Sequence, residues 1–254
     1  MSTTQQSLFA DGRISFGPFL KLADPAIVEI CALAGFDHVV IDREHGPLSV
    51  ETVQHLVRAA EARGIVPFVR VPRNEPSEIL RVLDVRAVGV HVPHISTADD
   101  ALRAVQACRF HPEGDRGVCR FVRAAAYTSI PAGRHFAEAN ERTIVVLHIE
   151  GTEGIAHLPE ILAVPGVNVV FLGPYDLSQA CGVPGEVQHP KVQQMMKQAV
   201  AQARAAGIVV GTFVESPEDA RAWAALGVQY LCYSVDVGIF YAACREIADR
   251  LRRE

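Results

Sequence analysis

The chain has 254 residues, of which 49% are hydrophobic, and a formal net charge of −5. This length and composition fit one large α/β domain, and we expect a single domain over residues 1–254. The scattered basic residues argue against nucleic acid or an anionic membrane as partner and favour a small molecule. No apolar run approaches the roughly 20 residues of a membrane span, and residues 1–13 lack a signal-peptide core, so we expect a cytoplasmic protein. The six cysteines form no Cys-x-x-Cys pair and are expected to be free thiols.

Short β-branched runs alternate along the chain with amphipathic stretches rich in Ala, Leu and Arg, which is typical of repeated βα units. Strands are predicted over residues 14–20, 38–41, 66–71, 88–92, 143–149, 168–172, 208–213 and 230–233. Helices are predicted over residues 25–34, 50–63, 75–85, 98–108, 154–162, 190–206, 217–226 and 237–252. Glycine repeatedly ends a helix just before the next strand. Eight such units, without a Gly-x-Gly-x-x-Gly or P-loop motif, predict a (β/α)8 TIM barrel rather than an open doubly wound sheet.

Residues 110–135 interrupt this rhythm. The segment is too long for an ordinary connection and carries Arg116, Arg120, Arg123 and Arg134. Long ordered loops of this kind are usually functional lids or interface elements. We therefore expect it to serve the active site or an interface.

Functional groups of such a barrel lie at the C-terminal ends of the strands. The second predicted strand leads into Asp42, Glu44 and His45, and the third contains Arg70 near its end. His45 is a candidate acid or base, because imidazole titrates near neutral pH, and Asp42 could orient it. Arg70 suits a carboxylate or a developing enolate oxygen, because guanidinium is always charged. The alternatives are a loop histidine with a local hydrogen bond and a structural salt bridge from Arg70 to Asp42 or Glu44.

Glu150 and Asp176 follow the fifth and sixth predicted strands, one βα unit apart. Two carboxylates on neighbouring strands make a hard, oxygen-rich site suited to Mg²⁺ or Mn²⁺. The alternative is a pair of solvated loop acids or helix N-caps. His91-x-x-His94 is a rival metal site, although the intervening Pro93 argues against a helix that presents both rings.

A divalent ion, an arginine and a histidine at one barrel mouth can together stabilise an enolate. The ion would polarise a 2-oxo acid, the arginine would add positive charge, and the histidine would move the proton of a hydroxyl at C4. That is retro-aldol chemistry. The nearest lysine to a strand end is Lys21, so Schiff-base catalysis is the weaker option.

Seven ordered segments, spread from about residue 14 to the C-terminus, carry a resemblance to a known family. They include Asp42-x-Glu44-His45-Gly46, Pro67-x-Val69-Arg70-Val71-Pro72, Leu83-Asp84, Gly89-Val90-x-Val92-Pro93, Gly114-x-Arg116-Gly117, Ile149-Glu150-x-x-x-Gly154 and Phe171-Leu172-Gly173-Pro174-x-Asp176-Leu177-Ser178. Together they resemble the metal-dependent pyruvate aldolases, which include 4-hydroxy-2-oxoheptanedioate aldolase and 2-dehydro-3-deoxyglucarate aldolase. The resemblance implies a lyase that splits a 4-hydroxy-2-oxo acid, with a second carboxylate or a polyhydroxy chain, into pyruvate and an aldehyde.

The same resemblance implies roles for particular residues. Glu150 and Asp176 would hold a divalent cation, Mg²⁺, Mn²⁺ or Co²⁺. Arg70 would contact the pyruvyl oxygen, and His45 with Asp42 would handle the proton. With the metal supplied in this way, Glu44 would orient metal-bound water.

The resemblance also implies substrate contacts and an assembly. Gly173, Pro174, Tyr175 and Asp176 would bind substrate, with the pyruvyl carboxylate on the backbone after Gly173. The protein would be a homo-oligomer, a hexamer built as a trimer of dimers, whose C-terminal helices exchange between subunits. Asp84 of one subunit would approach the catalytic site of another, although it could equally be an ordinary helix acid.

Two departures from the family pattern bear on the substrate. Many relatives have Asn where this chain has Tyr175, and many have Gly where it has Arg86. The basic segment 118–123 would favour an acceptor end that carries a carboxylate. These departures place the identity of the substrate in question and leave the metal site unaffected.

Two other function classes remain open. A related barrel lyase would act on a hydroxyacyl-CoA ester, with Arg116, Arg120 and Arg123 receiving the phosphates, or on an oxaloacetate-derived enolate. A barrel that only binds or assembles is disfavoured, because it leaves the set of strand-end residues without a role.

Overall fold

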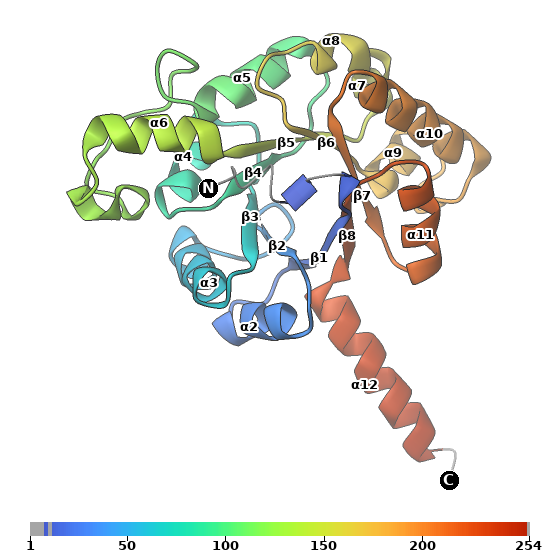
Figure 1. Ribbon diagram of the computed structural model, residues 1–254. Helices are drawn as coiled ribbons and strands as arrows, with labels where there is room; N and C mark the ends of the chain where they lie inside the picture. The colour runs from blue at the N-terminus through green and yellow to red at the C-terminus, as the bar shows by residue number, and fades with distance from the viewer. Residues whose placement is uncertain (1–7, 10–11, 253–254) are drawn as a thin grey trace.

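The computed structural model describes residues 8–9 and 12–252, and eight parallel strands among them close into a barrel (Figure 1). Sequential strands are hydrogen-bonded neighbours, and the eighth pairs with the first. The strands are β1 (Ser15–Leu20), β2 (His38–Asp42), β3 (Val66–Arg70), β4 (Gly89–Val92), β5 (Ile144–Ile149), β6 (Val169–Leu172), β7 (Val209–Val214) and β8 (Tyr230–Val235). The predicted (β/α)8 TIM barrel is confirmed.

Helices connect the strands and surround the barrel. They are α2 (Pro25–Leu33), α3 (Val50–Arg63), α4 (Pro76–Asp84), α5 (Ala98–Cys108), α6 (Ala132–Arg142), α7 (Thr152–Ala156), α8 (Leu158–Leu162), α9 (Pro174–Ala180), α10 (Pro190–Ala205), α11 (Pro217–Ala225) and α12 (Asp236–Arg252), with a 3₁₀ helix η2 (Arg123–Thr128). Local sequence fixes several ends: the Ser49 side chain accepts the amide of Thr52 at the start of α3, and Thr97 forms a capping box with Asp100 on α5. Such caps satisfy amides that have no partner within the helix.

Three segments differ from the predicted elements, and one of them, α9, lies in a stretch for which no helix was predicted. The helix predicted over residues 154–162 is divided into α7 and α8 at His157, because Pro159 has no N–H to continue the first helix. The segment over residues 110–135 contains η2 and the start of α6, neither of which was predicted. The rest of the predicted helices are found within a few residues of their expected ends.

The barrel interior is filled by large rings toward the N-terminal ends of the strands. Phe68 and Tyr230 are completely buried, and Phe9 packs edge-on against Tyr230 with ring centroids 5.8 Å apart. Room for these rings comes from glycine: a Cβ on Gly89 would lie 2.6 Å from the Phe68 ring, and one on Gly211 would lie 2.7 Å from the Tyr230 ring. Burying each ring contributes roughly 1.5–3 kcal/mol. This end of the interior is closed by packing, so the space for a ligand lies at the opposite end.

The C-terminal helix α12 projects away from the barrel (Figure 1). Only Asp236, its first residue, is buried, and its carboxylate accepts the amides of Lys21 and Leu22. Six large apolar side chains along the helix are exposed: Val237, Ile239, Phe240, Tyr241, Ile247 and Leu251. Within the described ranges, no helix combines the length and apolarity needed to cross a membrane.

All six cysteines lie in the described part of the chain and are free thiols, as expected. Burial raises the pKa of Cys108 to about 12, and burial together with Asp236 raises that of Cys31 to about 11. Thiols held in this way are poor nucleophiles. They behave as small apolar core residues.

Candidate active site

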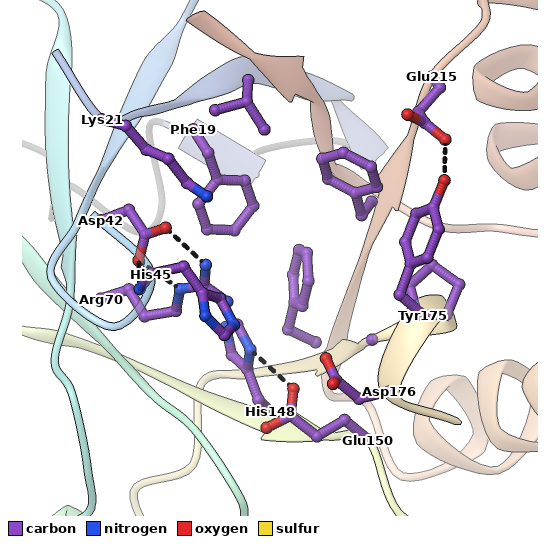
Figure 2. A pocket seen from close by; sticks show the side chains of 15 residues that line it. Phe19, Lys21, Asp42, His45, Arg70, His148, Glu150, Tyr175, Asp176 and Glu215 are labelled. Atoms are coloured by element: carbon purple, nitrogen blue, oxygen red, sulfur yellow. Dashed lines mark hydrogen bonds and ion pairs between the residues drawn. The ribbon is translucent and has the colours of Figure 1, made fainter. Parts of the chain in front are cut away.

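A cavity of about 290 Å³ opens at the C-terminal ends of the strands (Figure 2). Eight of the nine predicted site residues line it: Asp42, His45, Arg70, Glu150, Gly173, Pro174, Tyr175 and Asp176. The other lining residues are Phe19, Lys21, His148, Phe171, Phe213, Glu215 and Val235. The strand-end rule therefore identified most of the polar lining, and it omitted His148 and Glu215, which stand at or just beyond the ends of β5 and β7.

Arg70 is held in a fixed orientation at the end of β3. Its Nε and Nη2 donate to the two carboxylate oxygens of Asp42 at 2.9 and 2.8 Å, and its Nη1 lies 3.0 Å from Glu44 Oε2. The guanidinium also lies over the Phe19 ring, 4.6 Å from its centroid. Burial alone would raise the pKa of Asp42, but the hydrogen bonds and charge of Arg70 outweigh it and lower that pKa. Arg70 thus forms salt bridges with Asp42 and Glu44, the structural role considered as its alternative. It also lines the pocket, so the two roles are compatible.

His45 lies on the loop after β2 and its side chain is 57% exposed. The carboxylate of Asp42 accepts the backbone amides of Glu44 and His45 at 3.0 and 3.3 Å, in addition to the side chain of Arg70. Asp42 therefore fixes the path of the loop through its backbone. Its expected contact with the imidazole of His45 stays a prediction.

Glu150 is buried directly after β5. Its Oε1 accepts the backbone amide of His94 at 2.8 Å, and its Oε2 lies 3.5 Å from His148 Nδ1 (Figure 2). Burial raises the pKa of Glu150, but the interactions with His148 and His94 prevail and lower it to about 2. The carboxylate is therefore ionised at neutral pH and able to bind a cation.

Asp176 lies in the first turn of α9 and is exposed to the same cavity. Gly173, just before α9, allows the backbone to pass close to the side chain of Glu150. A Cβ at this position would lie 3.1 Å from Glu150 Oε2. The two carboxylates offer oxygen ligands, which hard divalent cations prefer. The chemistry of these donors suits a divalent cation, and the binding of one cation by both carboxylates stays a prediction.

A second set of possible metal ligands shares Glu150. Glu44, His94 and Glu150 place ligand atoms within 4.8 Å of one another, and His94 Nε2 lies 3.0 Å from Glu44 Oε1. The rival pair His91-x-x-His94 is not brought together, because His91 is completely buried on β4 and its ring bonds to His148 and Tyr230. Strand alternation directs His91 into the barrel, whereas His94 lies beyond the end of β4.

Tyr175 and Glu215 form one wall of the pocket (Figure 2). The phenol of Tyr175 donates to Glu215 Oε2, and its ring packs edge-on against Phe213 with centroids 6.0 Å apart. The hydrogen bond to Glu215, aided by burial, raises the pKa of Tyr175 to about 12. The tyrosine therefore stays neutral and places its hydroxyl beside a carboxylate.

Asp84 ends α4 and lies outside the described lining of the pocket. Its carboxylate pairs with Arg116 at 2.8 Å, and the side chain of Arg116 is 2% exposed. Arg123 pairs with Glu61. Two of the three arginines proposed as a phosphate groove are therefore engaged with acids, which weakens the CoA alternative.

Comparisons with known proteins concern the whole chain. Residues 15–243 match the HpcH/HpaI aldolase/citrate lyase family. A protein named 5-keto-4-deoxy-D-glucarate aldolase from Citrobacter koseri is 34% identical over 248 residues, 98% of this chain and 96% of the relative. A solved HpcH/HpaI aldolase/citrate lyase family protein from Burkholderia cenocepacia J2315 is 34% identical with a TM-score of 0.92, and 98% of each chain is covered. The solved citrate synthase SbnG is 30% identical with a TM-score of 0.88, and 99% of each chain is covered.

Proposed function

Because the chain belongs to the HpcH/HpaI aldolase/citrate lyase family, we propose that it is a divalent-metal-dependent aldolase. It cleaves a 4-hydroxy-2-oxo acid into pyruvate and an aldehyde. The observation that carries this proposal is the placement of Arg70, Glu150 and Asp176 around one cavity. The name of the Citrobacter koseri relative makes 5-keto-4-deoxy-D-glucarate the first substrate to test.

Glu150 and Asp176 would hold the divalent cation, with Glu44 and His94 beside them. When bound, Mg²⁺, Mn²⁺ or Co²⁺ supplies a Lewis acid for the oxygen atoms of a 2-oxo acid. The ionised state of Glu150 supports this assignment, because a carboxylate must lose its proton to bind a metal. The histidine of the second set would favour a transition metal over Mg²⁺.

Three residues of the chain, His45, Arg70 and Asp42, would carry out proton transfer, charge stabilisation and positioning during cleavage. His45 takes the proton of the C4 hydroxyl on an imidazole nitrogen, and the bond between C3 and C4 then breaks to release the aldehyde. Arg70 places its fixed positive charge beside the enolate oxygen, and Asp42 keeps the guanidinium in position. A proton returned to C3 completes pyruvate.

The pyruvyl end would lie beside the start of α9. Gly173 and Pro174 line the cavity there, and the amides that follow them would receive the carboxylate. Asp176, in the first turn of the helix, would contact both the cation and the substrate. These contacts stay predictions.

The wall formed by Tyr175 and Glu215 would receive the aldehyde portion. Glu215 carries a negative charge and Tyr175 occupies one of its oxygens, so its remaining acceptor positions suit hydroxyl donors. A carboxylate placed against this wall would be repelled, whereas Lys21 elsewhere in the lining could attract one. We therefore expect the hydroxyl groups of the aldehyde portion to face Glu215 and its carboxylate, where it has one, to lie away from this wall. Glu215→Gln should then improve kcat/KM for aldehydes that carry a carboxylate relative to neutral hydroxyaldehydes.

The direct test is deuterium exchange of the methyl protons of pyruvate in deuterium oxide, followed by NMR. Exchange requires enolate formation but no aldehyde, so it separates the enolate step from substrate choice. We expect exchange with Mg²⁺, Mn²⁺ or Co²⁺, its loss after chelation, and cleavage of 5-keto-4-deoxy-D-glucarate under the same conditions. Exchange that survives chelation would contradict the proposed metal dependence.

A second candidate is condensation of an oxaloacetate-derived enolate with another acceptor. It is supported by the 30% identity to the citrate synthase SbnG. The negative charge of Glu215 in the pocket argues against a product with several carboxylates at that wall. Incubation with oxaloacetate and an acceptor, followed by mass spectrometry for a new carbon–carbon bond, distinguishes the two functions.

We further propose that α12 mediates assembly. Its exposed apolar residues and its projection from the barrel suit packing against another copy, consistent with a hexamer that exchanges C-terminal helices. In that assembly Asp84 would reach a neighbouring site. Light scattering should give a hexamer for the native chain and a smaller species for Phe240→Asp. The expected cytoplasmic location stays a prediction.

A further inference from the structure

Behind Glu150, a chain of buried side chains runs into the barrel interior. His148 Nδ1 lies 3.5 Å from Glu150 Oε2, and His148 Nε2 lies 2.8 Å from His91 Nδ1. His91 Nε2 then lies 2.9 Å from the hydroxyl oxygen of Tyr230. The two histidines and the tyrosine are at most 1% exposed. The retro-aldol steps use none of the three, so their arrangement needs a separate explanation.

The rings in this chain are held in place by their neighbours. His148 stacks on Phe171 with centroids 4.6 Å apart and an interplanar angle of 25°, and His91 packs edge-on against Phe68. Three different strands, β4, β5 and β8, supply the three polar residues. Dense packing of this kind leaves each ring one orientation, so the positions of its nitrogen atoms are fixed.

The hydrogen bonds permit one proton order when both rings are neutral. A carboxylate only accepts, so the nitrogen of His148 that faces Glu150, Nδ1, carries a proton, and its Nε2 must then accept. His91 therefore donates a hydrogen bond from Nδ1 to His148. Its Nε2 accepts a hydrogen bond from the hydroxyl group of Tyr230. The pKa of His91 lies well below its usual value, mainly because the ring is buried and also because of electrostatic interactions with His148, Arg70 and His38. This agrees with a neutral ring. Every donor in the series points toward Glu150.

We infer that His148, His91 and Tyr230 are positioning residues that hold the Glu150 carboxylate in its cation-binding orientation by fixing the tautomer of His148. This inference rests on the metal site of the proposed function. The amide and Nδ1 of His94 both contact Oε1, and the imidazole of His148 faces Oε2, so Oε2 keeps a lone pair that is available for the cation. Outer partners that orient a ligand in this way commonly decide metal affinity.

The chain offers matched variants to test this role. His148→Phe removes the donor and keeps a planar ring against Phe171. Tyr230→Phe removes only the hydroxyl at the far end of the series. His38→Phe is the control, because His38 is completely buried in the same interior and its ring lies 4.3 Å from that of Tyr230, yet its nitrogen atoms contact Ser15 at 2.7 Å and Cys232 at 3.8 Å, outside the series.

The first measurement is the Mn²⁺ dissociation constant by calorimetry, on full-length protein shown to be folded by circular dichroism. His148→Phe should weaken binding by roughly 10- to 100-fold, the range usual for a lost outer partner of a metal ligand. Tyr230→Phe should weaken it less, and His38→Phe should leave it unchanged. Tyr230→Phe also covers the case in which His148→Phe fails to fold.

The second measurement is ¹⁵N NMR of the histidine rings in the metal-free wild type, with His148 and His91 assigned from their variants. Both should carry their proton on Nδ1, and Tyr230→Phe should change the spectrum of His91. A His148 protonated on Nε2, or unchanged Mn²⁺ affinity in His148→Phe and Tyr230→Phe, would overturn the inference. Wild type that binds no Mn²⁺ would instead overturn the proposed metal centre, and the positioning role with it.

Discussion

The two ends of the barrel interior differ in what they bury: the pocket end holds charged side chains, and the closed end holds packed rings. At the pocket end, Asp42 and Glu150 are buried charges, and each is stabilised by donors fixed in place: Arg70 for the first, His148 and the His94 amide for the second. At the closed end, Phe68 and other rings fill the space completely. The difference shows that charge is accommodated inside this barrel only where opposite charge or hydrogen bonds compensate for lost hydration.

This comparison separates the expected effects of substitution. Changes at the pocket end should reduce activity and leave the free energy of unfolding nearly unchanged. Changes at the closed end should do the reverse, except at Tyr230, whose hydroxyl is joined to the pocket through His91 and His148. Barrels of this type generally show such a division between their two faces.

The largest expected effect is at the pocket end. Glu150→Gln preserves the shape of the side chain but removes the charge that would bind the cation, so kcat/KM should fall by at least about 10³, equivalent to several kcal/mol of lost Lewis-acid assistance. Mn²⁺ calorimetry and the pyruvate exchange assay measure the loss. The control is Glu160→Gln on the exposed face of α8. Activity of Glu150→Gln equal to that of Glu160→Gln would remove Glu150 from the site.

The next effect tests the closed end. Phe68→Ala should lower the free energy of unfolding by about 3–5 kcal/mol, because the completely buried ring leaves a cavity that its neighbours cannot fill. Urea denaturation followed by circular dichroism measures it. Phe121→Ala is the comparison, since Phe121 is 69% exposed and should change stability little. Equal effects for the two variants would show that the closed end is not tightly packed.

A pH titration of stability examines the same region. Burial lowers the pKa of His38 from 6.5 to about 3, so the unfolded chain binds a proton below pH 6.5 that the folded chain excludes. The contribution of His38 to the free energy of unfolding should be fully present above pH 6.5. It should fall as the pH decreases toward 3, by up to about 1.4 kcal/mol per pH unit. His38→Phe should make this slope shallower between pH 6.5 and 5, and His55→Gln, at an exposed position, should not. If the dependence of stability on pH were the same in His38→Phe as in the wild type, the lowered pKa of His38 would be contradicted.

The barrel and most of its polar pocket could be predicted because each depends on local sequence. Helix-ending glycines mark the βα units, and the residue after a buried strand must lie at the mouth of a barrel, as Glu150 does. The break at His157 was missed because periodicity continues across it, although Pro159 gave the signal.

The contacts between strands could not be predicted in the same way. His91 and His94 are neighbours in sequence, but His91 bonds to His148 and Tyr230 on other strands, which depends on register and on which face each ring occupies. Likewise, Asp42 is three residues from His45, yet its carboxylate bonds to the side chain of Arg70. Sequence proximity favoured the wrong partner for His91 because it carries no information on inward and outward faces.

The smallest effects concern two helix ends that precede strands at the closed end. Gly64 ends α3 with φ +74, and no heavy atom lies within 4 Å of the position of an added Cβ. Gly64→Ala should therefore lower the free energy of unfolding by about 1 kcal/mol through backbone strain alone. Arg86, after α4, has φ +79 without being glycine, which explains why glycine suits this position.

Arg86→Gly should relieve that strain and raise stability by less than about 1 kcal/mol, because the freedom of glycine in the unfolded chain offsets part of the gain. Its ion pair with Glu61, 3.3 Å long and partly exposed, contributes little. Urea denaturation measures both variants, and the pyruvate exchange assay should find both fully active. Reduced exchange in either variant would show that these helix ends also control the chemistry at the pocket, and the separation of the two ends would fail.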